Sequence, residues 1–81
     1  MTAEQFATYT DKLIAEAQAK VEINSKKYGC SMGGFAKSDD GRVVVAMVAK
    51  RGQINCDHRA KEWVLDGERI SYENLKKTLV N

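Results

Sequence analysis

Apolar residues in the first third of the chain recur at the spacing of one helix face. Phe6, Leu13, Ala17, Val21 and Tyr28 follow one another at intervals of seven and four residues. These intervals place them along one side of a 3.6-residue repeat. The pattern predicts a long amphipathic N-terminal helix whose apolar side faces the core.

Both ends of this helix are marked in the sequence. Thr2 is a good N-cap, and Gln5 stands where its side chain can reach back to the cap. Lys26 and Lys27 give the last turn the positive charge that suits a helix C-terminus, and Gly29 follows as a residue able to take positive φ. The helix should therefore end just before Gly29.

An unbroken helix over residues 3–28 would be about 39 Å long at about 1.5 Å per residue. A domain of this size is narrower than that. The helix should therefore kink, fray or overhang the sheet. Asn24 and Ser25 are its weakest helix formers and mark a possible break. An overhang that packs against a second copy is the alternative.

The middle of the chain reads as extended structure. Residues 31–37 suit a strand with an irregularity at Gly33-Gly34, residues 38–41 a turn and residues 42–50 the returning strand. Residues 53–59 suggest a third extended piece after the turn at Arg51-Gly52.

Residues 43–49 are apolar at both alternating sets of positions, which is typical of a strand covered on both faces. The long helix covers one face. The other needs the last helix, a loop or a partner chain, because wide exposed apolar surfaces are uncommon in monomers. We therefore expect a homodimer.

A hairpin and a short helix are expected at the C-terminal end. Asp66-Gly67 is a favoured pair for the two positive-φ positions of a type I′ turn, and this register sets Trp63 opposite Ile70. Trp63 is expected in the core. Ser71 then caps a last helix that Leu75 helps to bury.

The predicted fold class is α+β with the order α-β-β-β-β-α. A long N-terminal helix packs on a small antiparallel sheet of three or four strands, and a short C-terminal helix follows. With 81 residues, 43% of them hydrophobic, the chain has room for one core, so residues 1–81 should form a single domain. No signal peptide or apolar span is recognisable, which predicts a cytoplasmic protein with reduced cysteines and no membrane partner.

The soft metal ligands do not indicate a metal centre. Cys30, Cys56 and His58 are three ligands without the pair-of-pairs spacing of a structural zinc site. A nucleophilic cysteine with His58 as its base would need an orienting group and an oxyanion pocket, and no motif supplies them. We expect no metal, no cofactor and no catalytic residues, hence a protein that is not an enzyme.

Basic residues form a candidate binding patch around one loop. The net charge of +2 is small, so only clustering could favour a nucleic acid. Four basic residues bracket the loop and two more end the first helix. Acidic neighbours dilute the patch, and known nucleic-acid-binding motifs are absent. The candidate residues are Lys26, Lys27, Lys50, Arg51, Arg59 and Lys61.

Binding is the function class that remains. The leading hypothesis is a small non-enzymatic protein-binding accessory factor, an inhibitor or regulator that occupies a partner's surface. The alternative is a nucleic-acid-binding module that uses the basic patch. Residues 63–71 followed by a short helix resemble the ends of small phage or plasmid accessory proteins. That resemblance implies action on a host or defence protein.

Overall fold

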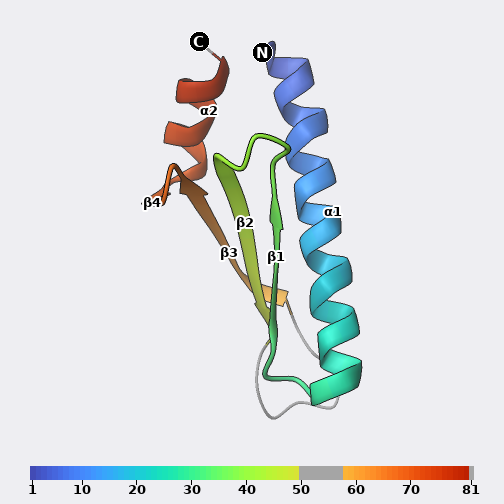
Figure 1. The fold of residues 1–81 in the computed structure, drawn as a ribbon. Coiled ribbons are helices and arrows are strands. Elements are labelled where there is room, and N and C mark those ends of the chain that lie inside the picture. Colours follow the sequence, from blue (N-terminus) through green and yellow to red (C-terminus); the bar gives the residue numbers. More distant parts are fainter. Residues whose placement is uncertain (50–57, 81) are drawn as a thin grey trace.

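The computed structural model describes residues 1–49 and 58–80, with residues 58 and 59 described by their backbone alone. It has the predicted α+β order, so the fold class is confirmed (Figure 1). Six elements follow one another: α1 (Ala3–Tyr28), β1 (Gly33–Lys37), β2 (Val43–Ala49), β3 (His58–Leu65), β4 (Glu68–Ile70) and α2 (Tyr72–Val80).

The predicted ends of α1 are confirmed. The Thr2 hydroxyl accepts a hydrogen bond from the Gln5 N–H, and the Gln5 side chain accepts one from the Thr2 N–H, which closes a capping box. At the other end Gly29 has a φ of +85° and donates its N–H to the Ser25 carbonyl. A residue with a Cβ would be strained at that φ.

α1 runs unbroken for 26 residues, so the possible break at Asn24 and Ser25 is wrong. The Asn24 side chain donates a hydrogen bond of 2.7 Å to the Gly33 carbonyl, which ties this part of the helix to β1. The helix fits because the molecule is elongated, measuring 42 × 20 × 18 Å. Tyr28 was expected on the buried face, but its ring is 55% exposed.

The four strands form one antiparallel sheet in the order β1-β2-β3-β4. Gly33 pairs with Val48 and Gly34 with Met47 in regular register, so the irregularity predicted at the two glycines is wrong. The register shifts instead between Val48 and Ala49, where β2 meets β3. β3 begins at His58 and includes Arg59 and Lys61, which the sequence had suggested belonged to separate pieces.

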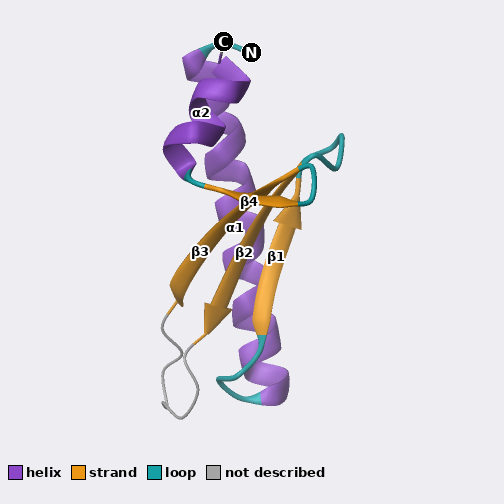
Figure 2. Cartoon of the chain, turned by 90° about the vertical axis from the view of Figure 1, so that its left-hand side faces the viewer, coloured by secondary structure: helices purple, strands orange, loops and turns teal. Residues whose placement is uncertain are grey.

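In Figure 2, α1 lies behind the sheet and α2 lies beyond one end of the strands, next to the N-terminal part of α1. The sheet face that packs on α1 is called the inner face. The side chains of β2 that point to this face are buried, as are Trp63 of β3 and Leu75 of α2. The predicted core position of Trp63 and its pairing with Ile70 are confirmed. The buried apolar residues of the core are Phe6, Leu13, Ala17, Val21, Ala36, Val43, Val45, Met47, Ala49, Trp63 and Leu75.

α1 approaches β1 most closely at Gly34. A Cβ built at this glycine would lie 2.7 Å from the Ala17 carbonyl oxygen and 2.7 Å from the Val21 nitrogen. Both are backbone atoms of α1 and cannot move without the helix. Gly34 thus sets the distance between α1 and the sheet.

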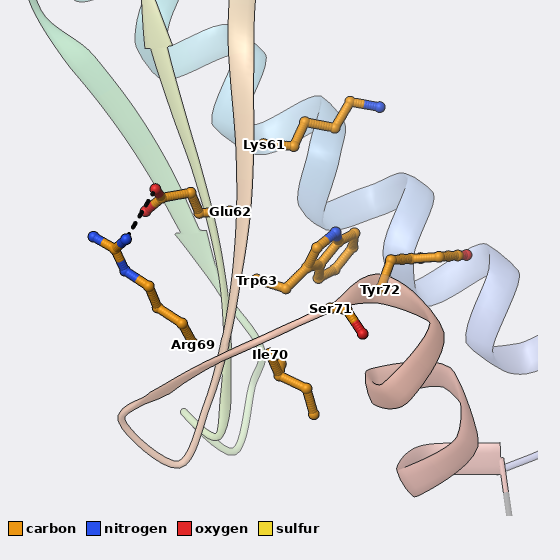
Figure 3. A pocket seen from close by; sticks show the side chains of 7 residues that line it. All are labelled: Lys61, Glu62, Trp63, Arg69, Ile70, Ser71 and Tyr72. Carbon is orange, nitrogen blue, oxygen red and sulfur yellow. Dashed lines mark ion pairs between the residues drawn. The ribbon is translucent and has the colours of Figure 1, made fainter.

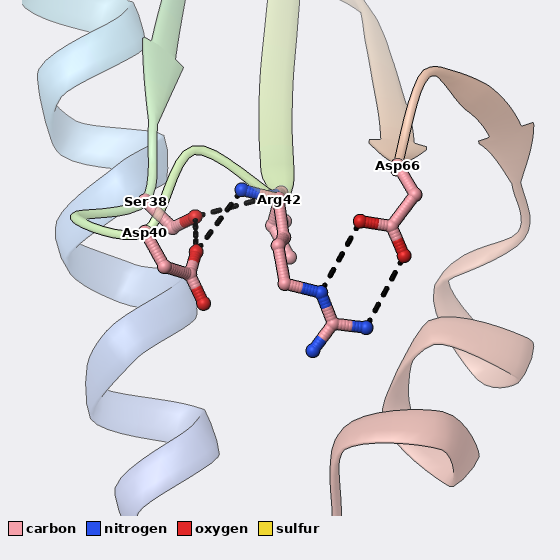
Figure 4. A network of polar contacts seen from close by, with 5 residues as sticks. Ser38, Asp40, Arg42 and Asp66 are labelled. Carbon is pink, nitrogen blue, oxygen red and sulfur yellow. Dashed lines mark hydrogen bonds and ion pairs between the residues drawn. The ribbon is translucent and has the colours of Figure 1, made fainter.

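Polar contacts join the two turns at one end of the sheet (Figure 4). Arg42 donates two hydrogen bonds of 3.2 Å to the Asp66 carboxylate in the β3–β4 turn. The Ser38 hydroxyl donates to Asp40 Oδ1 at 2.5 Å, and the Arg42 backbone N–H donates to the same oxygen at 3.0 Å. These hydrogen bonds lower the pKa of Asp40 below its ordinary value of 3.8.

Gly34→Ala should destabilise the protein by about 2 kcal/mol, because the added methyl group pushes α1 away from the core. Urea denaturation measures the change. Gly33→Ala is the matched control: its Cβ would lie 3.1 Å from the Met47 carbonyl and touch no helix atom, so a smaller loss is expected. Equal losses for the two variants would contradict the role given to Gly34.

Asp40→Asn should lower stability near neutral pH, and this difference should shrink in acid. A lowered pKa in the folded state gives stabilisation that is full above the unfolded value and is lost as pH falls through the folded value. Urea midpoints measured from about pH 7 to about pH 2 test this window. Asp39→Asn, in the same turn, is the control. A difference that stays constant with pH would exclude the carboxylate as its source.

Candidate protein-binding surfaces

The sheet face opposite the helices, called the outer face, is apolar and open. Phe35 is 49% exposed and Val48 is 48% exposed, and the other apolar residues of this face are alanines and valines. In the paired register Phe35 lies beside Ala46, and Val44 lies between Lys37 and Val64. No described element covers this surface. Its apolar members are Phe35, Val44, Ala46, Val48, Ala60 and Val64.

Charged side chains border the outer face on both sides. On the β1 side the Lys20 ammonium lies 4.7 Å from the centre of the Phe35 ring, and that of Lys37 lies 5.8 Å from it. On the β3 side Glu62 forms an exposed ion pair of 3.7 Å with Arg69. An apolar centre with a charged rim is the usual composition of a protein–protein interface.

A second feature is a cleft at the end of β4 (Figure 3). The Trp63 and Tyr72 rings lie 5.1 Å apart at its centre, and Tyr72 also stacks on Phe6 at 5.9 Å. Tyr72 is 41% exposed, so one ring of this stack faces solvent. The cleft has a volume of about 460 Å³ and is lined by Lys61, Glu62, Trp63, Arg69, Ile70, Ser71 and Tyr72.

A smaller cavity lies on the α1 side of the same rings. It has a volume of about 330 Å³ and shares Lys61, Trp63 and Tyr72 with the cleft. Its remaining lining residues are Thr10, Asp11 and Ile14 of α1. Lys61 therefore stands at the border of two hollows, next to a solvent-facing aromatic ring.

The structure does not assemble the basic patch from the members that it describes. Lys61 lies against residues 10–14 of α1, whereas Lys26 is at least twelve residues further along that helix. This separation is about 18 Å at about 1.5 Å per residue. Lys26 pairs with Glu22 at 3.6 Å, and Lys27 lies over the Tyr28 ring. Lys50 and Arg51 lie outside the described residues, as does the Arg59 side chain.

The prediction that the cysteines are reduced thiols is wrong for Cys30, because its sulfur is disulfide-bonded in the structure. Cys56 and the His58 side chain lie outside the described residues. Within residues 1–49 and 60–80, no three His, Cys, Asp or Glu side chains gather in a group that could hold a metal ion.

Two described groups have a clearly shifted pKa, and both belong to the turn contacts. The hydrogen bonds that Arg42 donates to the Asp66 carboxylate raise the pKa of Arg42. Those that Asp40 accepts from Ser38 and Arg42 lower the pKa of Asp40. Both side chains are exposed and hold turns together. They are not gathered in either hollow beside Lys61, so these shifts point to a structural role.

Sequence reasoning missed the cleft and named only part of the outer face. The apolar alternation over residues 43–49 indicated an uncovered face, but Phe35 was not singled out. Tyr72, at the start of α2, presents its ring to solvent. The predicted pairing of Trp63 with Ile70, two residues before the helix start, was the available signal, because it sets Tyr72 beside Trp63.

No protein-family model matches the chain, and neither a curated protein nor a solved structure shows significant similarity to it. As for membranes, α1 and α2 are the helices of the described chain, and neither is long and apolar enough to span a bilayer.

Tyr72→Ala should expose Trp63, the only tryptophan of the chain. Loss of the stacked ring should move the tryptophan emission to longer wavelength, increase its quenching by iodide and cost about 1 kcal/mol of stability. Fluorescence and urea denaturation measure both effects. Tyr28→Ala, at the exposed end of α1, is the control. Unchanged emission in Tyr72→Ala would show that the tyrosine ring does not cover Trp63.

Proposed function

We propose that this chain is a small non-enzymatic protein-binding accessory factor, an inhibitor or regulator that acts by occupying the surface of another protein. The observation that carries the proposal is the open outer face. Apolar side chains from three strands meet there without a covering element among the described residues, and such surfaces in small proteins are usually interfaces. Action on a host or defence protein is the concrete form that the phage or plasmid resemblance suggests.

In the free protein, a second copy of the chain is the occupant that we propose for the outer face, and the target protein would replace this copy. Two sheets stack well when their strands run nearly parallel. A twofold axis parallel to β2 would lay β1 of one copy over β3 of the other. Lys20 and Lys37 would then approach Glu62 of the second copy. The exposed Glu62–Arg69 pair contributes little within one chain, so Glu62 can exchange partners at small cost.

Light scattering behind size exclusion tests this arrangement. The wild-type protein should elute with about twice its chain mass of 9.0 kDa. Val48→Asp should elute as a monomer, because it places a charge on the middle strand of the contact while leaving the core intact. Ile23→Asp is the matched control: Ile23 is 63% exposed on α1, away from the sheet, and its variant should stay dimeric.

Other outcomes identify a different occupant. If the wild-type protein is monomeric and Val48→Asp abolishes capture of a protein that Ile23→Asp retains, the outer face binds that protein instead of a second copy. A monomer whose captured proteins are unchanged by Val48→Asp would refute an interface on the outer face.

The nucleic-acid alternative has its own signature. A complex with duplex DNA or RNA that weakens steeply as salt rises would favour it over protein binding. The same scattering experiment, repeated with added nucleic acid at low and moderate salt, supplies this comparison. The distance of Lys61 from Lys26 and Lys27 argues against a continuous patch among the described side chains.

A further inference from the structure

β3 is paired on its β4 side for only part of its length. β3 is eight residues long and β4 is three. β4 pairs with Trp63, Val64 and Leu65, after which the chain turns away at Ser71 into α2. On the side of β3 that faces away from β2, Figure 1 draws no other described element beside the remaining length of the strand. From Glu62 back toward its start, β3 therefore presents a free edge there.

The register fixes which backbone groups point to this free edge. The Asp66 N–H donates to the Arg42 carbonyl on the β2 side, and residues of a strand alternate their hydrogen-bonding direction. Val64 and Glu62 therefore bond toward β2, whereas Trp63 and Lys61 point the other way. Trp63 pairs with Ile70. Lys61 is two residues along, so its N–H and carbonyl point outward past the end of β4.

The cleft lies where β4 would run if the strand continued beyond Ile70. The Glu62–Arg69 pair borders it on the outer side, and Lys61, Trp63 and Tyr72 border it on the inner side (Figure 3). An added strand would thus find a notch for its backbone. Its residue opposite Lys61 would point to the inner side, toward the Trp63 and Tyr72 rings and the Ile14 side chain of α1.

Charge decides what kind of strand can pair with this edge. Lys61 is the basic side chain that the structure describes on this edge. If two copies paired antiparallel about Lys61, the two lysines would stand opposite one another. Like charges directly across a strand pair destabilise it, so this edge disfavours its own copy and favours an acidic strand.

We propose that the free edge of β3 and the Trp63–Tyr72 cleft together bind an extended acidic segment of a partner protein by strand addition. The segment places a bulky apolar side chain on Trp63 and Tyr72, and an acidic side chain diagonally across the strand pair from Lys61. Main-chain hydrogen bonds to Lys61 provide affinity, and the cleft provides selectivity. This inference rests on the protein-binding function proposed above but uses a different surface.

Titration with synthetic heptapeptides, followed by the fluorescence of Trp63, tests the proposal. The probe peptides contain no tryptophan, and their side chains alternate between the two faces of the added strand. Valine and threonine occupy the face that points to the outer side, and phenylalanine followed by glutamate occupies the face that points to the inner side. They should bind saturably and change the Trp63 emission. Replacing glutamate by lysine should weaken binding about tenfold, since an attraction across the pair becomes a repulsion. N-methylation of the peptide backbone should abolish binding.

Two variants at one position separate backbone pairing from charge. Lys61→Pro removes an N–H that the sheet itself does not use, a substitution that edge strands tolerate, and should abolish binding. Lys61→Gln keeps the N–H and loses the charge, so its binding should weaken only severalfold. Trp63 emission without peptide verifies that both variants are folded.

The outcomes of this experiment are independent of the outer face. Val48→Asp should bind the acidic peptide like the wild-type protein, so loss of dimerisation and loss of peptide binding are distinguishable. Equal binding of the glutamate and lysine peptides, unchanged binding by Lys61→Pro, or no binding by any peptide would each overturn the proposal. In the last case Lys61 serves only to keep the edge from pairing.

Discussion

The close contact between α1 and β1 at Gly34 is the constraint on which the rest of the structure depends. Because that residue has no side chain, the backbone of α1 reaches the sheet near Ala17 and Val21, and both of these residues are completely buried. A helix held so near packs its apolar stripe directly on β1 and β2. It then runs almost the full 42 Å of the molecule. The capping box and the hydrogen bond from Asn24 to Gly33 hold its two ends in place.

This arrangement completes the inner face and leaves two surfaces without a described partner. α2 joins α1 on the inner side, where Tyr72 stacks between Phe6 and Trp63. Nothing in the described chain is left for the outer face. Because α2 begins directly after β4, the same turn that completes the core also ends β4 early and opens the edge of β3. The apolar face and the open edge therefore have one structural origin, although their chemistry differs.

Local signals predicted the elements well, and contacts between distant residues explain most of what they missed. Thr2, Gly29 and Asp66-Gly67 act through their own backbone neighbourhood, so helix ends and the last hairpin could be predicted from sequence. The role of Gly34 could not be predicted, because it depends on contacts with Ala17 and Val21, which lie seventeen and thirteen residues earlier in the chain. Tyr28 fits the helical period but lies beyond the part of α1 that the sheet covers. For the candidate binding surfaces, the apolar residues at both alternating sets of positions in β2 indicated that one face of the sheet is open. The notch beside Lys61 depends on where β4 stops, which no local pattern indicates.

The apolar outer face should be exposed in one copy of the chain and covered when copies associate. Methyl NMR with a dissolved paramagnetic chelate measures this directly, by comparing Val44 and Val48 with the buried Val43 and Val45 at two protein concentrations. We expect strong broadening of the Val44 and Val48 signals in dilute solution and their protection in concentrated solution, whereas Val43 and Val45 should be protected throughout. Equal protection of all four valines in dilute solution, or no change in Val48 with concentration, would contradict this expectation.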